Sequence, residues 1–227
     1  MSEIAGCRDY LEITTDELIK QIEKKNMNPT DNFSEIKQEI LDRARFGAAC
    51  RHEYGRAYAA ETLGDLCTVI KDNFNWCCRN GVIDAPLLEK YKKDFARNEI
   101  YVNIDTERGF LLCDGNATVE AYGNTIVEAC GNATVEAWNN ATVEAWDNAT
   151  VEAYDNATVE AYGNTTVEAY DNATVKAYGN TKVKAWNNAY CSSWSLIECK
   201  LSDNALYLVH STNTVYYAND NLKFVKQ

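Results

Sequence analysis

Histidine, long apolar segments and paired cysteine motifs are scarce or absent in this sequence. The 227 residues include two histidines, His52 and His210, and no Cys-x-x-Cys motif, so the usual zinc-ligand spacings cannot be assembled. No run of about 18 apolar residues occurs, which predicts that the chain does not cross a membrane. We therefore expect no bound metal, no cofactor and no membrane partner.

Basic residues are also in deficit, with 22 Lys and Arg against 34 Asp and Glu and a formal net charge of -12. A protein that grips phosphates needs the opposite balance, so direct binding of nucleic acid is not expected. The amino terminus has neither a basic start nor an apolar stretch, which favours a cytoplasmic location. The nine cysteines are odd in number and scattered, as expected of reduced thiols.

Motifs that carry catalysis are missing as well. The sequence contains no glycine-rich phosphate loop and no metal-ligand cluster. Cys50, His52 and Glu53 have the residue types of a nucleophile, a base and an orienting acid, but residues two apart on a helix point in different directions. The sequence therefore predicts a protein that is not an enzyme and has no catalytic residues.

The front of the chain, up to about residue 98, has the apolar spacing of helices. One helix is predicted over 15–26 and another after Ser34. A further apolar series runs over 58–80, and a short helix is predicted over 86–96. Together these segments predict a small helical bundle. The apolar stripe of the helix after Ser34 is Ile36, Ile40, Leu41 and Ala44.

Arginines within this front half are close enough in sequence to form a basic face. Acidic residues lie among them, which favours an ordinary solvated helix surface over a binding site. The arginines are Arg43, Arg45, Arg51 and Arg56.

An eight-residue repeat begins at Asn116, with asparagine recurring every eight residues to Asn188. The octad reads Asn, Ala or Thr, Thr, Val, Glu or Lys, Ala, Tyr or Trp, and then Gly, Asp or Asn, and we number its places one to eight. Gly-Asn, Asp-Asn and Asn-Asn at the junctions predict tight bends with left-handed backbone. The segment is therefore expected to consist of short strands joined by bends.

The Thr-Val-Glu-Ala-Tyr core of each octad alternates with a period of two, which predicts a β-strand. Val and Ala then face one side, and Thr, Glu and the aromatic residue face the other. Burying unpaired glutamates would cost several kcal/mol each. We therefore expect the Val and Ala side to be interior, with the glutamates and aromatics outside.

A single octad is too short to enclose a core, because its five or six extended residues make only one side of a coil. Two octads per coil predict a flattened parallel β-solenoid with a thin core of Val and Ala. The alternative is an antiparallel β-meander, since two-residue turns also fit a period of eight. Near-identical octads favour the parallel stack, which places like residues on like, including a ladder of asparagines.

The predicted fold class is therefore α+β, with a small N-terminal helical bundle, a parallel β-solenoid and a C-terminal β cap. Leu111 and Cys113 match the Val and Ala places, so the stack is expected to begin imperfectly before Asn116, with the helical half covering that end. Bulkier residues, including Phe224 and Val225, predict a closing β-segment. The predicted domains are 1–98 (helical), 99–115 (N-terminal cap), 116–195 (octapeptide repeat) and 196–227 (C-terminal cap).

Each face of a two-octad coil carries a column of glutamates beside a column of aromatic residues. Like charges about 4.8 Å apart repel by roughly 1 kcal/mol in water, so some benefit should accompany them. Solubility and strand stacking provide one explanation, and a binding surface provides another. The predicted partner-binding residues are Glu120, Glu136, Glu152, Glu168, Trp138, Tyr154 and Tyr170 on one face, and Glu128, Glu144, Glu160, Trp146 and Tyr162 on the other.

Charge density points to the class of partner. Residues 116–195 contain seven Glu, three Asp and three Lys. Spread over about five strand spacings, this net charge is roughly half as dense as that of duplex DNA. We expect a non-enzymatic binding or inhibitory protein that engages a basic protein surface, for instance on a nucleic-acid-binding protein. The alternative is a glycan-binding fibre or adhesin module, and either could act as an oligomer.

The phrase Asn-Ala-Thr-Val-Glu-Ala-Tyr and the segment Asn213-Thr214-Val215-Tyr216-Tyr217-Ala218 resemble octapeptide-repeat proteins of gut bacteria and their phages and mobile elements. The likeness covers about residues 110–227, and that group lends no established activity. It implies a setting in which a phage-borne antagonist of host defence is expected. An acidic solenoid that imitates nucleic acid is similar in shape to pentapeptide-repeat proteins, although the octad departs from their five-residue period.

Overall fold

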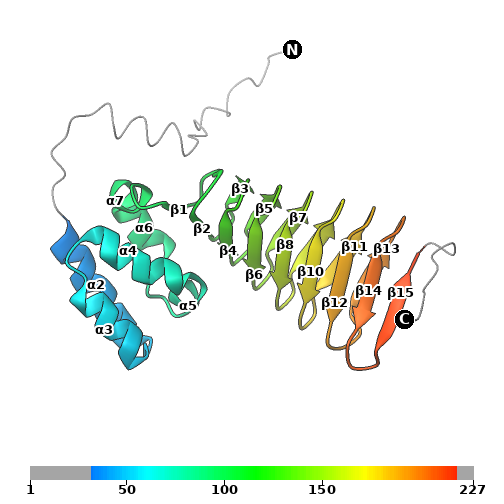
Figure 1. Ribbon diagram of the computed structural model, residues 1–227, viewed down its shortest axis with the longest axis horizontal. Coiled ribbons are helices and arrows are strands. Elements are labelled where there is room, and N and C mark those ends of the chain that lie inside the picture. Colours follow the sequence, from blue (N-terminus) through cyan, green and yellow to red (C-terminus); the bar gives the residue numbers. More distant parts are fainter. Residues whose placement is uncertain (1–31, 219–227) are drawn as a thin grey trace, which may run out of the picture.

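The computed structural model describes residues 32–218, which form a helical domain followed by a β-solenoid (Figure 1). The helix predicted over 15–26 lies outside these residues, as do Phe224 and Val225 of the predicted cap. The predicted α+β class is confirmed. The helices are α2 (Phe33–Phe46), α3 (Arg51–Ala59), α4 (Leu63–Asp72), α5 (Phe74–Arg79), α6 (Ala85–Lys90) and α7 (Lys92–Ala96).

The helices form where the sequence supplies caps and apolar spacing. In α4, the Thr62 side chain accepts a hydrogen bond from the Asp65 N–H while the Asp65 carboxylate accepts one from the Thr62 N–H, which is a capping box. In α6, the Asp84 side chain accepts from the Leu87 N–H. The short helix predicted over 86–96 is divided at Tyr91 into α6 and α7. The predicted core residues of α2 are buried: Ile36, Ile40, Leu41 and Ala44.

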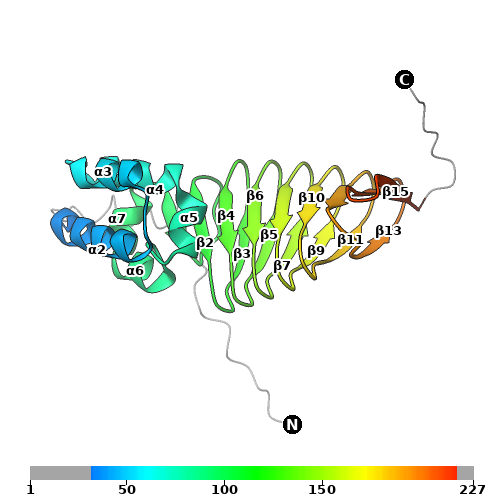
Figure 2. The same cartoon turned by 90° about the horizontal axis from the view of Figure 1, so that it is seen from below.

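The strands alternate between two sheets, and labelled strands of both can be followed along the solenoid in Figure 2. Neighbours within the repeat are parallel and sixteen residues apart, as in the pairing of Val135 with Val151. Two octads per coil are thus confirmed, and the antiparallel meander is wrong. The nine-stranded sheet contains β1 (Ile100–Val102), β2 (Phe110–Cys113), β4 (Ile126–Ala129), β6 (Thr142–Ala145), β8 (Thr158–Ala161), β10 (Thr174–Ala177), β12 (Tyr190–Ser193), β14 (Leu206–Val209) and β15 (Thr214–Tyr217). The six-stranded sheet contains β3 (Thr118–Ala121), β5 (Thr134–Ala137), β7 (Thr150–Ala153), β9 (Thr166–Ala169), β11 (Lys182–Ala185) and β13 (Glu198–Leu201).

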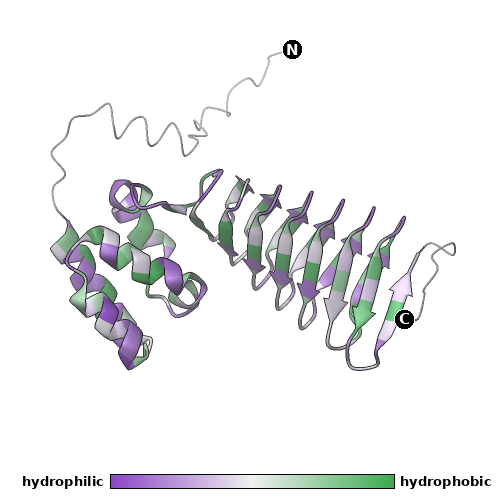
Figure 3. Ribbon diagram, in the orientation of Figure 1, coloured by the Kyte–Doolittle hydropathy of each residue, from purple (hydrophilic) through white to green (hydrophobic). Residues whose placement is uncertain are grey.

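The solenoid core is built from the Val and Ala places, as the alternation predicts. Val151 and Ala153 are both 0% exposed, and Figure 3 shows the apolar bands that alternate along the strands. Place two is also buried, although it precedes the Thr-Val-Glu-Ala-Tyr segment from which the interior was predicted. Thr165 occupies this place, and its hydroxyl donates to the Tyr162 carbonyl at 2.5 Å. A threonine can therefore replace alanine there without leaving its hydroxyl unsatisfied.

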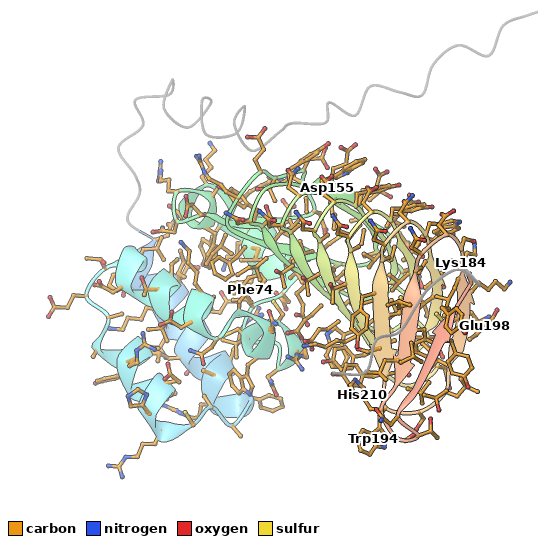
Figure 4. The ribbon with its side chains drawn as sticks, turned by 45° about the vertical axis from the view of Figure 1, so that its right-hand side comes forward. Phe74, Asp155, Lys184, Trp194, Glu198 and His210 are labelled. Atoms are coloured by element: carbon orange, nitrogen blue, oxygen red, sulfur yellow. The ribbon has the colours of Figure 1, made fainter. Side chains whose placement is uncertain are left out.

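The bends have the predicted left-handed backbone at place eight, with φ of 56° at Asp155 and 70° at Gly163. The predicted asparagine ladder is confirmed: Asn164 Nδ2 donates to Asn148 Oδ1 at 3.4 Å. The bends line up along two opposite edges of the flattened solenoid, and the residues at place eight differ between them. Figure 4 shows Asp155 on the edge opposite Trp194. We call the edge that carries Asp155 the Asp edge, and its residues at place eight are Gly123, Asn139, Asp155, Asp171, Asn187 and Asp203.

Both ends of the solenoid depart from the regular repeat. Strand β2 pairs in register with β4, so Leu111 and Cys113 take the Val and Ala places, as predicted, and α6 and α7 pack on β1. At the other end, β13 and β14 continue the parallel register beyond residue 195. Strand β15 then closes the sheet by antiparallel pairing with β14. The parallel stack therefore extends further than the predicted boundary at 195.

Overfilling the thin core should destabilise the protein. Replacing Ala153 with leucine inserts a large side chain into a site that is 0% exposed, between Ala137 and Ala169 of the neighbouring coils. We expect a loss of about 1–3 kcal/mol in the free energy of unfolding, measured by urea denaturation. Thr150→Leu, on the outer face of the same strand, is the matched control and should change it by less than about 0.5 kcal/mol. Equal losses in both variants would contradict a sealed interior.

Candidate functional site

The outer face of the six-stranded sheet carries one uninterrupted column of glutamates. Glu120 is directly opposite Glu136 in the register of β3 and β5, and Glu152 and Glu168 continue the column on β7 and β9. Adjacent members are therefore about one strand spacing, 4.8 Å, apart. We call this surface the acidic face, defined by Glu120, Glu136, Glu152 and Glu168 together with Tyr122, Trp138, Tyr154 and Tyr170.

Neighbouring tyrosines and a lysine make this row of like charges tolerable. The Tyr154 hydroxyl donates to Glu152 Oε2 at 2.5 Å, and the Tyr170 hydroxyl donates to Glu168 Oε2 at 2.8 Å. Lys184 follows in the column and lies 2.7 Å from Glu168 Oε1. Hydrogen bonding from Lys184 and Tyr170 lowers the pKa of Glu168. The charge of Glu168 is therefore favoured, and its repulsion with its neighbours is offset inside the column.

The aromatic residues of this face form a continuous stack, which we call the aromatic column: Tyr122, Trp138, Tyr154, Tyr170 and Trp186. Ring centroids are 4.0 Å apart between Trp138 and Tyr154, 4.9 Å between Tyr154 and Tyr170, and 4.6 Å between Tyr170 and Trp186. The planes within these pairs are inclined by 10° or less. Tyr122 lies farther off, with its ring centroid 6.4 Å from that of Trp138 and the planes inclined by 17°. From Trp138 to Trp186 the rings cover one another's faces, so mainly ring edges and hydroxyls meet solvent.

Glu128 contradicts the expectation that every glutamate of the repeat lies outside. It is 1% exposed on β4, and within residues 32–218 neither of its carboxylate oxygens has a hydrogen-bond partner. Arg79, the last residue of α5, places its Nε 3.7 Å from Glu128 Oε1. An external partner cannot reach this carboxylate in the folded protein. The helical domain covers it because helices pack against the first strands of the nine-stranded sheet.

Arg79 connects the helical domain to three side chains of the solenoid, namely Glu128, Glu144 and Trp146. Its guanidinium lies 3.0 Å from Glu144 Oε2 and 4.7 Å from the centre of the Trp146 ring. Asn75 donates to the other oxygen of Glu144. Burial raises the pKa of Glu128 to about 8, the charge of Glu144 adds to the rise, and the charge of Arg79 opposes it. We call Asn75, Arg79, Glu128, Glu144 and Trp146 the interdomain cluster.

The rest of the column on the nine-stranded sheet remains on the surface. The Tyr162 hydroxyl donates to Glu160 Oε2 at 2.9 Å, and Lys176 Nζ lies 2.8 Å from Glu160 Oε1. Hydrogen bonds from Lys176 and Tyr162 lower the pKa of Glu160. Arg79 thus pairs with Glu144 at one end of this column, and Lys176 pairs with Glu160 at the other. The predicted residues Glu144 and Trp146 belong to the interdomain cluster, whereas Glu160 and Tyr162 face solvent in part.

A signal for the interdomain contact is present in the second octad. Ile126 replaces threonine at place three, and Cys130 replaces the aromatic residue at place seven. Both pack against the apolar core of the helical domain. The two departures from the template therefore mark where the helices cover the outer face, and Glu128 lies between them.

The other residues considered for chemistry have structural contacts. His52 Nδ1 lies 2.7 Å from Glu53 Oε1, and Arg56 lies 2.8 Å from Glu53 Oε2, so Glu53 is held by two neighbours on its own helix. Cys50 is exposed at the start of α3. Arg43 pairs with Glu39 at 2.8 Å, so at least part of the predicted basic stretch is neutralised, as the solvated interpretation favours.

Within residues 32–218, no helix is long and apolar enough to cross a bilayer, and no three His, Cys, Asp or Glu side chains are grouped to hold a metal ion. Comparison of the chain with protein-family models, curated proteins and solved structures gave no match. Function is therefore inferred from the geometry and charge of the surfaces described above.

Proposed function

We propose that the acidic face binds a basic surface of a macromolecular partner, and that the protein acts by this binding rather than by catalysis. The observation that carries the proposal is the register of four glutamates on adjacent strands of one sheet. Helix α5 contacts the other sheet through Glu128 and Glu144, so the acidic face is the broader of the two charged surfaces.

The distribution of charge supports a directional surface. Asp155 and Asp171 on the adjoining Asp edge add to the glutamate column, whereas Lys182, Lys184 and Lys200 follow on β11 and β13. Negative charge thus occupies the six-stranded sheet from β3 to β9, and the lysines lie beyond it on the side away from the helical domain. Such a one-sign surface accelerates association with a basic partner and makes the affinity sensitive to salt.

The aromatic column favours a charged partner over a sugar. Carbohydrate rings bind flat against exposed aromatic faces, but the inner rings of this column cover one another at 4.0–4.9 Å. What it offers outward is ring edges and tyrosine hydroxyls beside carboxylates. These groups suit arginine and lysine side chains, whose stems can lie along apolar edges while their charges meet glutamate.

The partner class we favour is a protein whose own nucleic-acid site is rich in Arg and Lys, because the acidic face would occupy that site in place of phosphates. A phage-borne antagonist of a host defence protein in the cytoplasm is the setting that fits this chemistry. The partner would then release the protein as salt rises, in the same sense as it releases nucleic acid.

Neutralising three members of the column should weaken binding to an arginine-rich peptide, used as the probe in calorimetry. For the triple variant Glu136→Gln, Glu152→Gln and Glu168→Gln we expect about a tenfold loss of affinity at low salt, since each exposed ion pair is worth up to about 1 kcal/mol. The loss should shrink at high salt because of screening.

A second triple variant, Glu35→Gln, Glu61→Gln and Glu89→Gln, serves as the control. It changes the net charge equally but lies in the helical domain. It should retain most of the affinity for the peptide. If both triple variants weaken binding to the same degree, the peptide responds to net charge alone and the acidic face has no special role.

A further inference from the structure

The aromatic column brings oxidisable side chains into van der Waals contact along the solenoid. Trp138, Tyr154 and Tyr170 are consecutive, with centroids 4.0 and 4.9 Å apart and nearly parallel planes. Tryptophan and tyrosine are the two aromatic side chains that lose a single electron most readily. Electron transfer between such rings becomes faster as the distance between them falls, and the distances within this stack are short.

The column also provides for the proton that a tyrosine releases on oxidation. A phenol gives up its electron easily only when a base takes the proton at the same time. Glu152 Oε2 accepts the Tyr154 hydroxyl hydrogen at 2.5 Å, and Glu168 Oε2 accepts that of Tyr170 at 2.8 Å. Burial and the hydrogen bond from Tyr170 to Glu168 raise the pKa of Tyr170 to about 12, so the phenol is protonated and poised to donate.

Trp138 differs from these tyrosines because its indole Nε1 is buried and has no hydrogen-bond partner within residues 32–218. An oxidised indole without an acceptor retains its proton and remains a radical cation, which is a stronger oxidant than the neutral radical. Trp138 would therefore draw an electron from the ring stacked on it rather than stabilise the oxidised state itself.

We propose that the aromatic column is an electron-transfer chain that moves a one-electron oxidation from tryptophan to carboxylate-paired tyrosine. A diffusible radical oxidant of the class of the azide radical removes one electron from Trp138 and is itself reduced to its anion. One electron then passes from Tyr154 to the Trp138 radical cation, the Tyr154 O–H bond breaks, and its proton moves to Glu152 Oε2. The products are neutral indole, a neutral phenoxyl radical and a protonated Glu152, so charge and atoms balance.

The same chemistry carries the oxidation one coil further. An electron passes from Tyr170 to the Tyr154 radical while the proton on Glu152 returns to Tyr154, and the Tyr170 proton moves to Glu168. Tyr154 and Glu152 are then restored, and the radical rests on Tyr170. This transfer does not require a bound basic partner, although Glu152 and Glu168, which accept the phenolic protons, also belong to the acidic face.

Pulse radiolysis of the full chain with the azide radical, a one-electron oxidant that attacks indole, tests the proposal. In a Trp76→Phe, Trp146→Phe, Trp194→Phe background, the remaining indoles, Trp138 and Trp186, belong to the aromatic column. We expect the indolyl absorption to convert to tyrosyl absorption at a rate independent of protein concentration. A rate proportional to concentration would show transfer between molecules and overturn the proposal.

Adding Tyr122→Phe, Tyr154→Phe and Tyr170→Phe should abolish this conversion, because phenylalanine keeps the stack but cannot be oxidised. The control adds Tyr58→Phe, Tyr216→Phe and Tyr217→Phe, exposed positions away from the column, and should keep it. If the variant that lacks Trp76, Trp146 and Trp194 does not fold, the two triple tyrosine variants are made in the wild-type sequence instead. The amplitude of the indolyl-to-tyrosyl conversion then distinguishes the outcomes. Conversion that survives the column variant, or is lost equally in the control, overturns the proposal.

The carboxylates are tested separately with Glu152→Gln and Glu168→Gln in the same background. The amide cannot take the phenolic proton, so conversion should become slower and more dependent on buffer base. An unchanged rate would show that the proton leaves by another path and would overturn the part assigned to Glu152 and Glu168.

Discussion

Replacing Arg79 with methionine should lower the free energy of unfolding by about 3–5 kcal/mol at about pH 9, where Glu128 is ionised. Methionine keeps the apolar stem that lies against the Trp146 ring but removes the charge 3.7 Å from Glu128 and 3.0 Å from Glu144. The buried carboxylate is then uncompensated. Denaturation by urea, followed by intrinsic fluorescence, measures the loss.

The effect of Arg79→Met should be smaller at about pH 6, because Glu128, whose pKa is about 8, is then neutral in the folded protein. Arg97→Met is the control, since Arg97 forms a part-exposed pair with Asp94 at 3.3 Å and should change stability by less than about 1 kcal/mol at either pH. A loss of equal size at both pH values would argue that Arg79 acts by packing and not by its charge.

Glu128→Gln should raise stability at alkaline pH and flatten its dependence on pH. The pKa of Glu128 is raised from an ordinary 4.5 to about 8 in the folded protein, so the fold binds a proton that the unfolded chain releases. The stability that comes from this difference in proton binding is fully present below about pH 4.5 and is lost progressively as the pH rises to about 8. The wild type should therefore lose roughly 3–5 kcal/mol across that window, and the glutamine variant should not.

Glu168→Gln, on the other sheet, should change the pH dependence of stability in the opposite direction. Hydrogen bonds from Lys184 and Tyr170 lower the pKa of Glu168, so its contribution is present above the ordinary value and is lost as the pH falls through the lowered one. The glutamine variant should thus be less stable than the wild type at neutral pH. Stability curves for both variants between acid and alkaline pH check this, and parallel curves for wild type and Glu128→Gln would contradict a buried, neutral Glu128.

The octad contains most of the information that determines the solenoid. Its alternation fixes which side chains are interior, because burying a glutamate column would cost more than burying Val and Ala. Its length fixes two octads per coil, since one is too short to enclose a core. Val151 and Ala153 at 0% exposure, and Val135 paired with Val151, confirm both inferences.

The covering of one face by helices could not be derived from the repeat. The alternation assigns Glu128 to the outside, which is correct for the strand but not for the molecule, because a second domain packs on that outside. Ile126 and Cys130 break the template on either side of Glu128 and could have indicated an apolar contact there. Arg79, which compensates Glu128, belongs to a helix whose orientation no local pattern determines.

The candidate site was predictable in composition but not in its contacts. The columns of Glu120, Glu136, Glu152 and Glu168 follow from counting every second octad. The rings cover one another only in particular side-chain rotamers, and the spacing of strands does not determine those rotamers. The pairing of Tyr154 with Glu152 within one strand depends on the same rotamers.

Alternation of the strands between two sheets also constrains how such a chain can lengthen or shorten. Gain of a single octad would transfer every later strand to the opposite sheet, so β15 would close the other layer. An octad gained between β9 and β11 would also separate Lys184 from Glu168. Duplication of a pair, sixteen residues as separate Thr118 from Thr134, leaves both layers and both ends unchanged. Viable length variants of this protein should therefore differ by whole coils.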